Sequence, residues 1–400
     1  MRQQTIFFFI LGVDVLILLL QIQNLSIASS EIYILEEQRN FLSFFYHFLF
    51  ELFGRNDDSL RIPLLLLHLA SVFLLYDLSK QYLTKARDRI WLLLLYVMLP
   101  GTLSAGIVLS HASFILFGLM LYLYLQTRVK EVYTYPLLLF FAVADGGFAY
   151  LFFGLLIFAF FQKNYRLLMV NILFLLLSAY LYRLQIYGAP SGHFLDTLAV
   201  YSAIFTPIVF VYLVYVLYRR YLAKKTDLLW YISTFTFIFT LLLSFRQRIA
   251  VEYFAPYLMI ALPLGAQTFV HSYRVRLKQF RKGYKLIFVL SFIFLSLNTL
   301  VVVFNKYLYL YLDEPKKHFA YNMHVAKELA QQLQKKHIRC VSTDLDMQKR
   351  LHFYGIGKCS DVYLQKLSKS SNEKGDVTIR YKGVPVYKAS VTKINKNGSK

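Results

Sequence analysis

The feature that most constrains this chain is a series of long apolar segments separated by short polar connections. Most extend for about 15–20 residues, close to the length that a helix needs to cross the hydrocarbon core of a bilayer. Because that core offers no water to backbone N–H and C=O groups, such segments are expected to be helical. The segments lie at about 5–23, 59–79, 90–109, 112–126, 135–161, 167–185, 200–218, 228–245, 253–270 and 286–304.

The composition supports a membrane protein and excludes several other classes. Hydrophobic residues make up 58% of the chain and charged residues 16%, whereas soluble domains have roughly 45–50% and about 25%. A soluble enzyme, a disordered chain and a disulfide scaffold are therefore excluded. The net charge of +22 could indicate nucleic acid. In so apolar a chain it is better explained by basic segments near anionic lipid, so we expect membrane lipid and no nucleic acid as partner.

The charge is concentrated toward the C-terminus. From Lys306 onward there are 19 Lys and Arg against 8 Asp and Glu, and no apolar run of membrane length. We therefore predict two domains. Residues 1–305 form an all-α polytopic membrane domain, and residues 306–400 form a small soluble α/β domain.

The segment 135–161 could be one long helix, or two short helices broken at Ala144-Asp145-Gly146-Gly147. With the break, all five strongly basic connections fall on one side of the membrane, as the positive-inside rule requires. These connections are Lys80–Arg89, Arg128–Lys130, Lys163–Arg166, Arg219–Lys225 and Arg274–Lys285. We adopt the break, which predicts about eleven spans in the cell (inner) membrane. The N-terminus is then cytoplasmic and the C-terminal domain extracytoplasmic.

The first outward connection, about 24–58, contains apolar residues at helical spacing. We expect an amphipathic helix lying in the outer membrane interface. Its apolar positions are Phe41, Phe44, Phe45, Phe48, Leu49, Leu52 and Phe53.

The C-terminal segment combines helical and extended patterns. Helices are predicted at Ala326–Lys335 and Met347–Tyr354, and strands at Ile338–Ser342, Asp361–Leu364 and Val377–Tyr381. Both cysteines of the chain, Cys340 and Cys359, lie here. They form either a disulfide or two separate thiols, because sequence does not give their separation. No repeated metal-ligand spacing occurs, and we expect neither a metal nor a cofactor.

No nucleotide-binding, zinc-protease or serine-hydrolase motif occurs, so candidate chemistry rests on charges in the outward connections. Glu31, just after the first span, is either a general base or an ordinary acidic residue. Arg246 and Arg248 stand in another outward connection, with Glu252 just after them. They could bind a lipid phosphate, or close the loop by pairing with Glu252.

Three further polar residues stand in or beside apolar segments. Asp14 lies near the middle of the first span, where an unpaired charge is costly. We interpret it as a hydrogen-bonded or protonated packing residue rather than as part of a proton or ion path. His68 is interpreted as a packed helix residue. His111 opens the second outward connection and is the better site candidate.

Several short motifs together resemble the GT-C glycosyltransferases, in particular the protein mannosyltransferase, aminoarabinose transferase and RgtA/B/C/D-like groups. Such members carry an acidic residue, often Asp-Glu, followed by Tyr, and then a motif of the form FG-x-(S/N)-(E/D)-x-x-x-R-(I/L)-P. The similar segments are Glu31-Ile32-Tyr33, Phe53-Gly54-Arg55-Asn56-Asp57-Asp58-Ser59-Leu60-Arg61-Ile62-Pro63, Leu99-Pro100, Ser110-His111-Ala112, and Tyr253-Phe254-Ala255-Pro256-Tyr257 with Pro263. Two positions depart from the pattern, since Ser30 replaces the usual Asp and His111 stands where an acidic residue is common.

The resemblance implies transfer of a sugar from a polyprenyl-phosphate carrier to a lipid, glycan or protein acceptor, on the outer side of the membrane. It implies that Glu31 removes a proton from the acceptor hydroxyl. The predicted substrate-binding residues are Arg246, Arg248, His111, Glu252 and Arg61.

Two other classes compete with this enzymatic hypothesis. A transporter or flippase for a lipid-linked or anionic substrate would show paired inverted repeats and broken helices around a midplane site. The sequence indicates one broken helix, without a counterpart in the other half. A membrane scaffold whose outer domain binds a partner is the third class.

Overall fold

The computed structural model of this chain describes residues 2–37, 40–182, 192–367 and 376–393. The chain divides into two compact units, which we describe separately. Unit 1 comprises Met1–Leu18 and Pro63–Thr299, and unit 2 comprises Leu19–Ile62 and Leu300–Lys400. The first outward connection therefore belongs to the same unit as the C-terminal segment. The domain boundary predicted near residue 305 stays a prediction.

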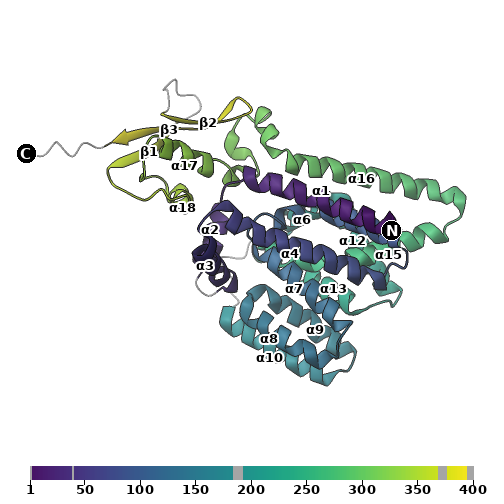
Figure 1. Cartoon of the computed structure of the whole chain (residues 1–400). Helices are drawn as coiled ribbons and strands as arrows, with labels where there is room; N and C mark the ends of the chain where they lie inside the picture. The colour runs from purple at the N-terminus through teal and green to yellow at the C-terminus, as the bar shows by residue number, and fades with distance from the viewer. Residues whose placement is uncertain (1, 38–39, 183–191, 368–375, 394–400) are drawn as a thin grey trace, which may run out of the picture. The chain divides into compact units, whose positions relative to one another are not determined.

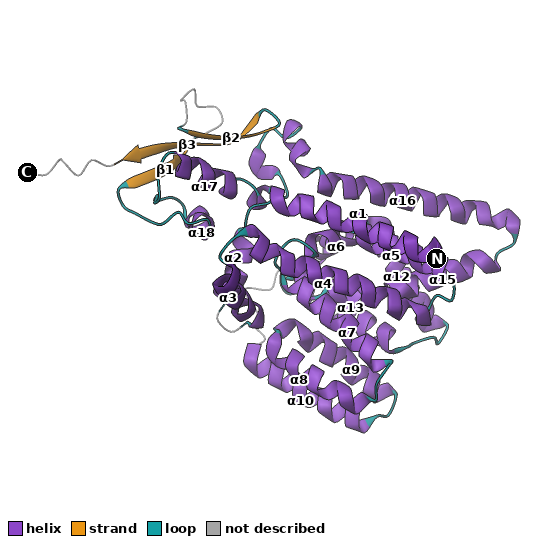
Figure 2. Ribbon diagram, viewed as in Figure 1, coloured by secondary structure: helices purple, strands orange, loops and turns teal. Residues whose placement is uncertain are grey.

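Helices dominate the described residues, and the strands are confined to the C-terminal segment (Figures 1 and 2). The first helices are α1 Arg2–Asn24, α2 Ser29–Glu36, α3 Phe41–Phe53, α4 Asp57–Leu78, α5 Ala86–Met98, α6 Pro100–Ala105, α7 His111–Gln126, α8 Tyr135–Ala144 and α9 Ala149–Phe161. They are followed by α10 Tyr165–Tyr182, α11 Phe194–Phe205, α12 Pro207–Leu222, α13 Leu228–Ser244, α14 Ala255–Met259, α15 Leu262–Val275, α16 Arg281–Val303, α17 Ala326–Lys335 and α18 Leu345–Phe353. The strands are β1 Val362–Lys366, β2 Val377–Tyr381 and β3 Val384–Lys393.

Several of these helices have the length and composition of membrane spans. Among the described residues, 4 helices are long and apolar enough to cross a membrane, or up to 5 if a bent pair counts as one span. The four are Gln3–Asn24, Asp57–Gln81, Tyr165–Tyr182 and Lys278–Val303. Other apolar helices, such as α7, α9 and α13, are shorter. The predicted class, a helical polytopic membrane protein with a small strand-containing C-terminal part, is confirmed, whereas the count of eleven spans stays a prediction.

The helix break predicted at Asp145 is present. Helix α8 ends at Ala144, a short 3-10 helix η3 occupies Gly146–Phe148, and α9 starts at Ala149. The Asp145 carboxylate accepts a hydrogen bond from the Gly147 N–H at 2.7 Å, which caps the turn. A second break, not predicted, separates α11 from α12, which meet at an angle of 105°. Pro207 begins α12, where its missing N–H leaves no donor unsatisfied.

Unit 1 is a bundle of packed helices. Helix α9 packs against α10 and α13, and α14 packs against α7 and α13. Aromatic rings fill these contacts, as in the stack of Phe141 on Phe148, whose centroids lie 4.2 Å apart. Residues 183–185, which belong to a predicted span, lie outside the described residues.

Unit 2 has a core shared by helices and a sheet. The three-stranded sheet has the order β1-β3-β2, with both pairs antiparallel. Helix α17 packs against β2 and α18, and α18 also packs against α2, which in turn contacts α3. The core residues include Leu329 and Leu333 of α17, Leu351 of α18 and Val377 of β2.

Helix α3 is amphipathic, as predicted. Leu42, Ser43 and Tyr46 are buried, whereas Phe44 and Phe48 are 74% and 53% exposed. An apolar stripe of this kind on a helix surface is typical of a segment that lies against lipid.

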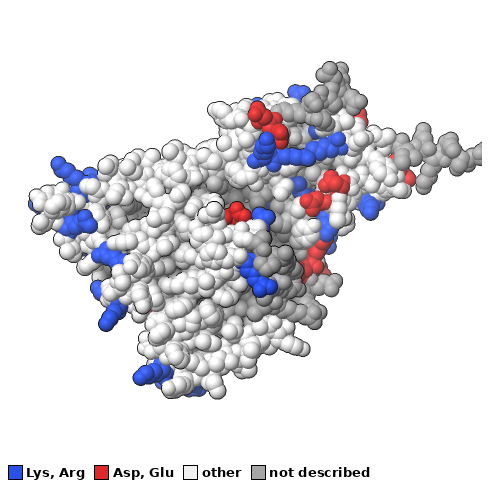
Figure 3. Space-filling model, turned by 180° about the vertical axis from the view of Figure 1, so that it is seen from behind, with Lys and Arg blue, Asp and Glu red and all other residues white. Residues whose placement is uncertain are grey.

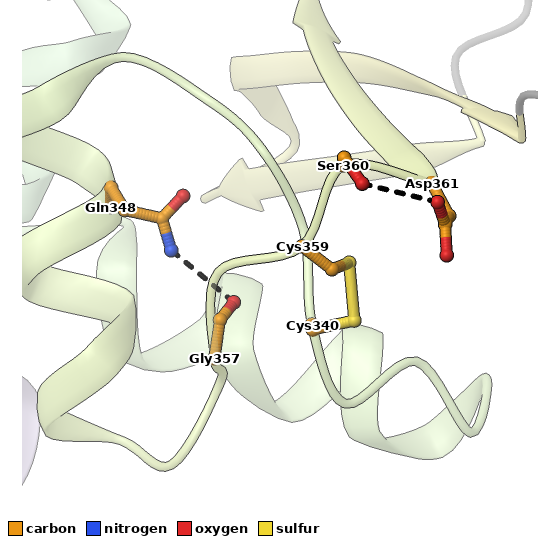
Figure 4. The surroundings of a disulfide bond; sticks show 6 residues. All are labelled: Cys340, Gln348, Gly357, Cys359, Ser360 and Asp361. Carbon is orange, nitrogen blue, oxygen red and sulfur yellow. Dashed lines mark hydrogen bonds between the residues drawn. A yellow bond between two sulfur atoms is a disulfide. The ribbon is translucent and has the colours of Figure 1, made fainter.

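The C-terminal segment agrees with the sequence in most elements. The helices α17 and α18 and the strands β1 and β2 are confirmed within one or two residues. The strand predicted at Ile338–Ser342 is wrong. Cys340 and Ser342 form only isolated bridges, to Gly357 and Tyr363, so no continuous ladder can form. Cys340 and Cys359 form a disulfide with Cα atoms 5.4 Å apart (Figure 4), which selects between the two alternatives left open by the sequence.

Candidate functional site

The first candidate cluster is built around the N-terminus of α2, within unit 2. Helix α2 begins at Ser29, and the Glu31 carboxylate turns back to accept the N–H of Ala28 at 2.8 Å. In this contact, an acidic residue in the first turn of the helix accepts the backbone N–H of the residue that precedes the helix. Glu31 is fully buried. It thus lies on a short helix within the first outward connection.

Arg61, at the start of α4, holds this carboxylate. Its two terminal nitrogens lie 3.3 Å from the two oxygens of Glu31, and one of them also donates to the carbonyl of Ser26 at 3.0 Å. Both side chains are 0% exposed. The structure therefore brings together two predicted site residues, in a buried bidentate ion pair of the kind that is sensitive to loss of either partner.

A second buried arginine, Arg350 of α18, holds the segment just before α2. Its Nε donates to the carbonyl of Ile27 at 2.9 Å, and a terminal nitrogen donates to Ser26 Oγ at 3.2 Å. Burial lowers the pKa of Arg350, and negative groups including Glu31 oppose that shift. Glu31, Arg61, Arg350 and Ser26 form what we call the arginine cluster.

The sequence analysis missed Arg350, although a signal was present. Arg350 stands three residues after Met347 and directly before Leu351, both on the apolar side of a helix correctly predicted there. A basic residue on the buried side of a helix indicates a partner in the interior, because an unpaired buried charge is costly.

The second candidate cluster lies in unit 1, where α7 begins. Nδ1 of His111 lies 2.6 Å from Oδ2 of Asp145, and both side chains are almost fully buried. The other Asp145 oxygen accepts the N–H of Gly147, whose carbonyl in turn accepts the Tyr257 hydroxyl at 2.7 Å. The helix break at Asp145 thus places a carboxylate beside the imidazole and fixes its orientation.

The short 3-10 helix η4, Val251–Tyr253, packs against this pair. The Tyr253 ring stacks on His111 with centroids 4.5 Å apart. The approach is close, because a Cβ added at Gly147 would overlap the side chains of Ile115 and Tyr253. His111, Asp145, Glu252 and Tyr253 form what we call the histidine cluster.

Glu252 stands at the surface of the histidine cluster. Its side chain is exposed, yet surrounding protein desolvates the carboxylate and raises its pKa; Asp145 raises it further, whereas His111 opposes the shift. The predicted site residues His111 and Glu252 are thus brought into one cluster.

Arg246 and Arg248 are placed differently from the other predicted residues. Both lie in the turn that follows α13, and both are exposed. In the part of the chain that the structure describes, neither forms an ion pair with Glu252 or with another acidic residue. The alternative in which they close their own loop by pairing with Glu252 is therefore not found.

Asp14 and His68 form a buried pair of their own in unit 1. His68 Nε2 lies 2.8 Å from Asp14 Oδ2, with both side chains 3% exposed. The His68 ring also stacks on Tyr96. The interpretation of both as packed residues is confirmed, and the hydrogen-bond partner of Asp14 is His68.

Charged side chains are distributed unevenly over the surface. In the view of Figure 3, large parts of the surface carry neither acidic nor basic residues; both kinds occur together in one part, and basic residues occur without acidic ones in others. Within the described ranges, no group of three or more His, Cys, Asp and Glu side chains could hold a metal ion.

Comparison with known proteins identifies a fold but not a family. No protein-family model matches the sequence, and no curated protein matches it. Among solved structures, the chain is similar to ArnT from Cupriavidus metallidurans, crystallised in the apo state. The TM-score is 0.54 and the sequence identity 11%, and the match covers 87% of this chain and 84% of that chain. The chain therefore has an ArnT-like fold, and with its long apolar helices it is an integral membrane protein.

Proposed function

We propose that this chain is a membrane glycosyltransferase that moves a sugar from a polyprenyl-phosphate carrier to a lipid, glycan or protein acceptor on the outer face of the cell membrane. The observation that carries the proposal is the ArnT-like fold, which extends over most of both chains. Support also comes from the buried carboxylate Glu31, which stands where the motif resemblance expects a functional acidic residue. The disulfide between Cys340 and Cys359 is in keeping with an oxidising compartment for unit 2.

The proposed reaction needs three groups. A base takes the proton of an acceptor hydroxyl, whose oxygen forms a bond to the anomeric carbon of the sugar. The bond from that carbon to the phosphate oxygen breaks, and the carrier phosphate leaves with the electron pair. Positive groups near the departing phosphate would stabilise its growing charge. We assign this last role to Arg246 and Arg248, because they are exposed and guanidinium groups bind phosphate well.

Glu31 is the first candidate for the base. Both of its oxygens already accept hydrogen bonds, from Arg61 and from the Ala28 N–H. An acceptor hydroxyl would therefore have to join or replace one of these bonds. The arrangement holds the carboxylate in a single orientation, which favours a positioned base if the substrate reaches it.

His111 is the second candidate. Its Nδ1 faces the Asp145 carboxylate at 2.6 Å. A carboxylate that holds one ring nitrogen fixes the tautomer and so prepares the other nitrogen for proton uptake. Asp145 would then be a positioning residue.

A transfer assay separates the two candidates. Membranes containing wild type or a variant are given radiolabelled polyprenyl-phosphate sugar, and the label gained by the acceptor is measured per amount of folded protein. Losing the base is expected to slow transfer by about 10²-fold or more. A glycosyltransferase with Glu31 as base loses activity in Glu31→Gln, and one with His111 as base loses it in His111→Gln.

A matched control guards against a trivial packing effect. His68→Gln removes a histidine from a buried Asp–His pair outside both clusters, whose separation of 2.8 Å is close to the 2.6 Å between His111 and Asp145. It should leave transfer near the wild-type level. If no variant of Glu31, His111, Arg246 or Arg248 changed transfer, the assignment of a glycosyltransferase site to these clusters would be wrong.

A further inference from the structure

Unit 2 contains a pocket whose lining includes none of the residues assigned to the proposed reaction. Its volume is about 600 Å³, and all of its lining residues belong to this unit. Helices α2 and α3 contribute one side, and α18 with the residues after it contributes the other. Its basic lining residues are Arg55, Lys349, Lys358, His47 and His352.

The charge of the pocket is unbalanced. Its acidic lining residue, Glu36, is already paired with Lys349 at 2.6 Å, and the Lys349 ammonium also lies over the Tyr33 ring. Arg55 and Lys358 are exposed and have no ion-pair partner among the described residues. Two positive charges are therefore available to a ligand.

The remaining lining is apolar. Phe50 of α3 and Phe353 of α18 meet edge to face, with centroids 5.9 Å apart, and Ile32 and Leu35 of α2 are buried beside them. A small inorganic anion would leave this apolar surface exposed to water. A ligand with an apolar part would cover it and gain the free energy of removing it from water.

A neighbouring pocket has a smaller excess of positive charge. It has a volume of about 450 Å³ and shares Arg55, His352 and Phe353 with the first. Its acidic residue Asp57 forms an ion pair with Lys327 at 2.8 Å, which leaves Arg55 as its unpaired charge among the described residues. It offers no apolar surface comparable to that of α2.

We propose that the 600 Å³ pocket binds a phospholipid of the surrounding membrane. Its phosphate lies between Arg55 and Lys358, and its apolar part covers Phe50 and Phe353. Guanidinium and ammonium groups are the usual ligands of phosphate in proteins. Because α3 carries an exposed apolar stripe with Phe44 and Phe48, the pocket has a membrane surface as its natural source of ligand.

Binding, rather than sugar transfer, tests this proposal, so its failure would leave the proposed function untouched. The purified full-length chain in a non-ionic detergent is titrated with dihexanoyl phosphatidic acid, dihexanoylglycerol and inorganic phosphate, and binding is measured by calorimetry. The phosphatidic acid should bind most tightly. Arg55→Gln/Lys358→Gln should weaken that binding by roughly 10-fold or more, the scale of losing charge-assisted hydrogen bonds.

A charge-matched control is available in the same unit. Lys316→Gln/Lys317→Gln removes two exposed positive charges outside this pocket, and should change binding by less than about twofold, since only screened long-range attraction is lost. Three outcomes would overturn the proposal. They are absent binding of phosphatidic acid by the wild type, equal weakening by both double variants, and inorganic phosphate binding as tightly as the phosphatidic acid.

Discussion

At the scale of single residues, Glu31 of the arginine cluster has two roles to separate: it is an ion-pair partner that the fold requires, and it is a candidate base for sugar transfer. Glu31 and Arg61 are both fully buried and hold each other, so removing one charge leaves the other uncompensated. Breaking a buried pair in this way destabilises a protein by about 3–5 kcal/mol, whereas removing both charges can be nearly neutral. The two roles can therefore be separated by comparing single and double variants.

We predict that Glu31→Gln lowers the unfolding free energy by about 3–5 kcal/mol, because Arg61 loses its counter-charge. Glu31→Gln/Arg61→Gln should recover most of that stability. Thermal unfolding of the purified chain measures both. If Glu31 is the base, the double variant is folded but inactive in transfer; recovered activity would show that the carboxylate serves only as an ion-pair partner.

A second prediction at this scale concerns His324 in unit 2. Burial lowers its pKa from 6.5 to about 3, and Lys306, His318 and Arg350 add to the shift. Nδ1 of this histidine lies 2.9 Å from the Tyr309 hydroxyl. The folded state keeps the His324 ring neutral, whereas the unfolded state protonates it below pH 6.5. The contribution of this histidine to the free energy of unfolding is therefore complete above that pH. It is lost as the pH falls toward 3, by about 1.4 kcal/mol per pH unit.

The measurement is thermal unfolding of the full chain between pH 4 and 7. Unfolding of His324→Gln should take up about one proton fewer than unfolding of wild type, so its free energy of unfolding should fall less steeply as the pH is lowered. His337→Asn is the control, since His337 is exposed and its positive φ of 59° suits asparagine. Equal slopes for wild type and His324→Gln would contradict the account.

At the scale of elements, the C-terminal segment is held by its disulfide as well as by its core. Cys340 and Cys359 are separated by 19 positions and join two irregular segments that share only isolated bridges. We predict that Cys340→Ser/Cys359→Ser lowers stability by about 3 kcal/mol, because the unfolded chain is no longer constrained by a loop of this size. Wild-type thiols should resist alkylation until a reductant is added. Labelling of both without reductant would contradict the disulfide.

The elements also show where the sequence was informative. The apolar periodicity of α17, and the Asp145-Gly146-Gly147 signal between α8 and α9, depend on local sequence and were predicted correctly. Helix α2 was not predicted, since Ser29–Glu36 is short and its packing on α3 and α18 comes from residues far away in sequence. The strand at Ile338–Ser342 was wrong because extended propensity alone does not supply a neighbouring strand.

The same limit applies to the candidate sites. Glu31, Arg61 and His111 could be named from motifs, because their positions along the chain carry the resemblance. The other members of the two clusters could not be named in this way. The contacts of Ser26 with Arg350, and of His111 with Asp145, join residues 324 and 34 positions apart. Long-range pairing of this kind depends on tertiary packing, which a single sequence does not specify.

At the scale of the whole molecule, the orientation in the membrane follows from the distribution of basic connections. We predict that a reporter fused after Lys306 is active on the outer side and one within Lys80–Arg89 on the inner side. This predicted topology depends on the break at Asp145, which is present in the structure, because only with that break does the positive-inside rule place all five basic connections on one face. Activity of the Lys306 fusion in the cytoplasm would mean that a span has been counted wrongly.

The central claim, that the chain transfers a sugar from a lipid carrier, is tested most directly with purified protein in sealed liposomes. A labelled polyprenyl-phosphate sugar and candidate acceptors are supplied, and the label on carrier and acceptor is followed together with the free polyprenyl phosphate. We predict that each sugar gained by the acceptor is matched by one released carrier phosphate. A chain that leaves every lipid-linked donor intact, or that uses a nucleotide sugar instead, would contradict the account.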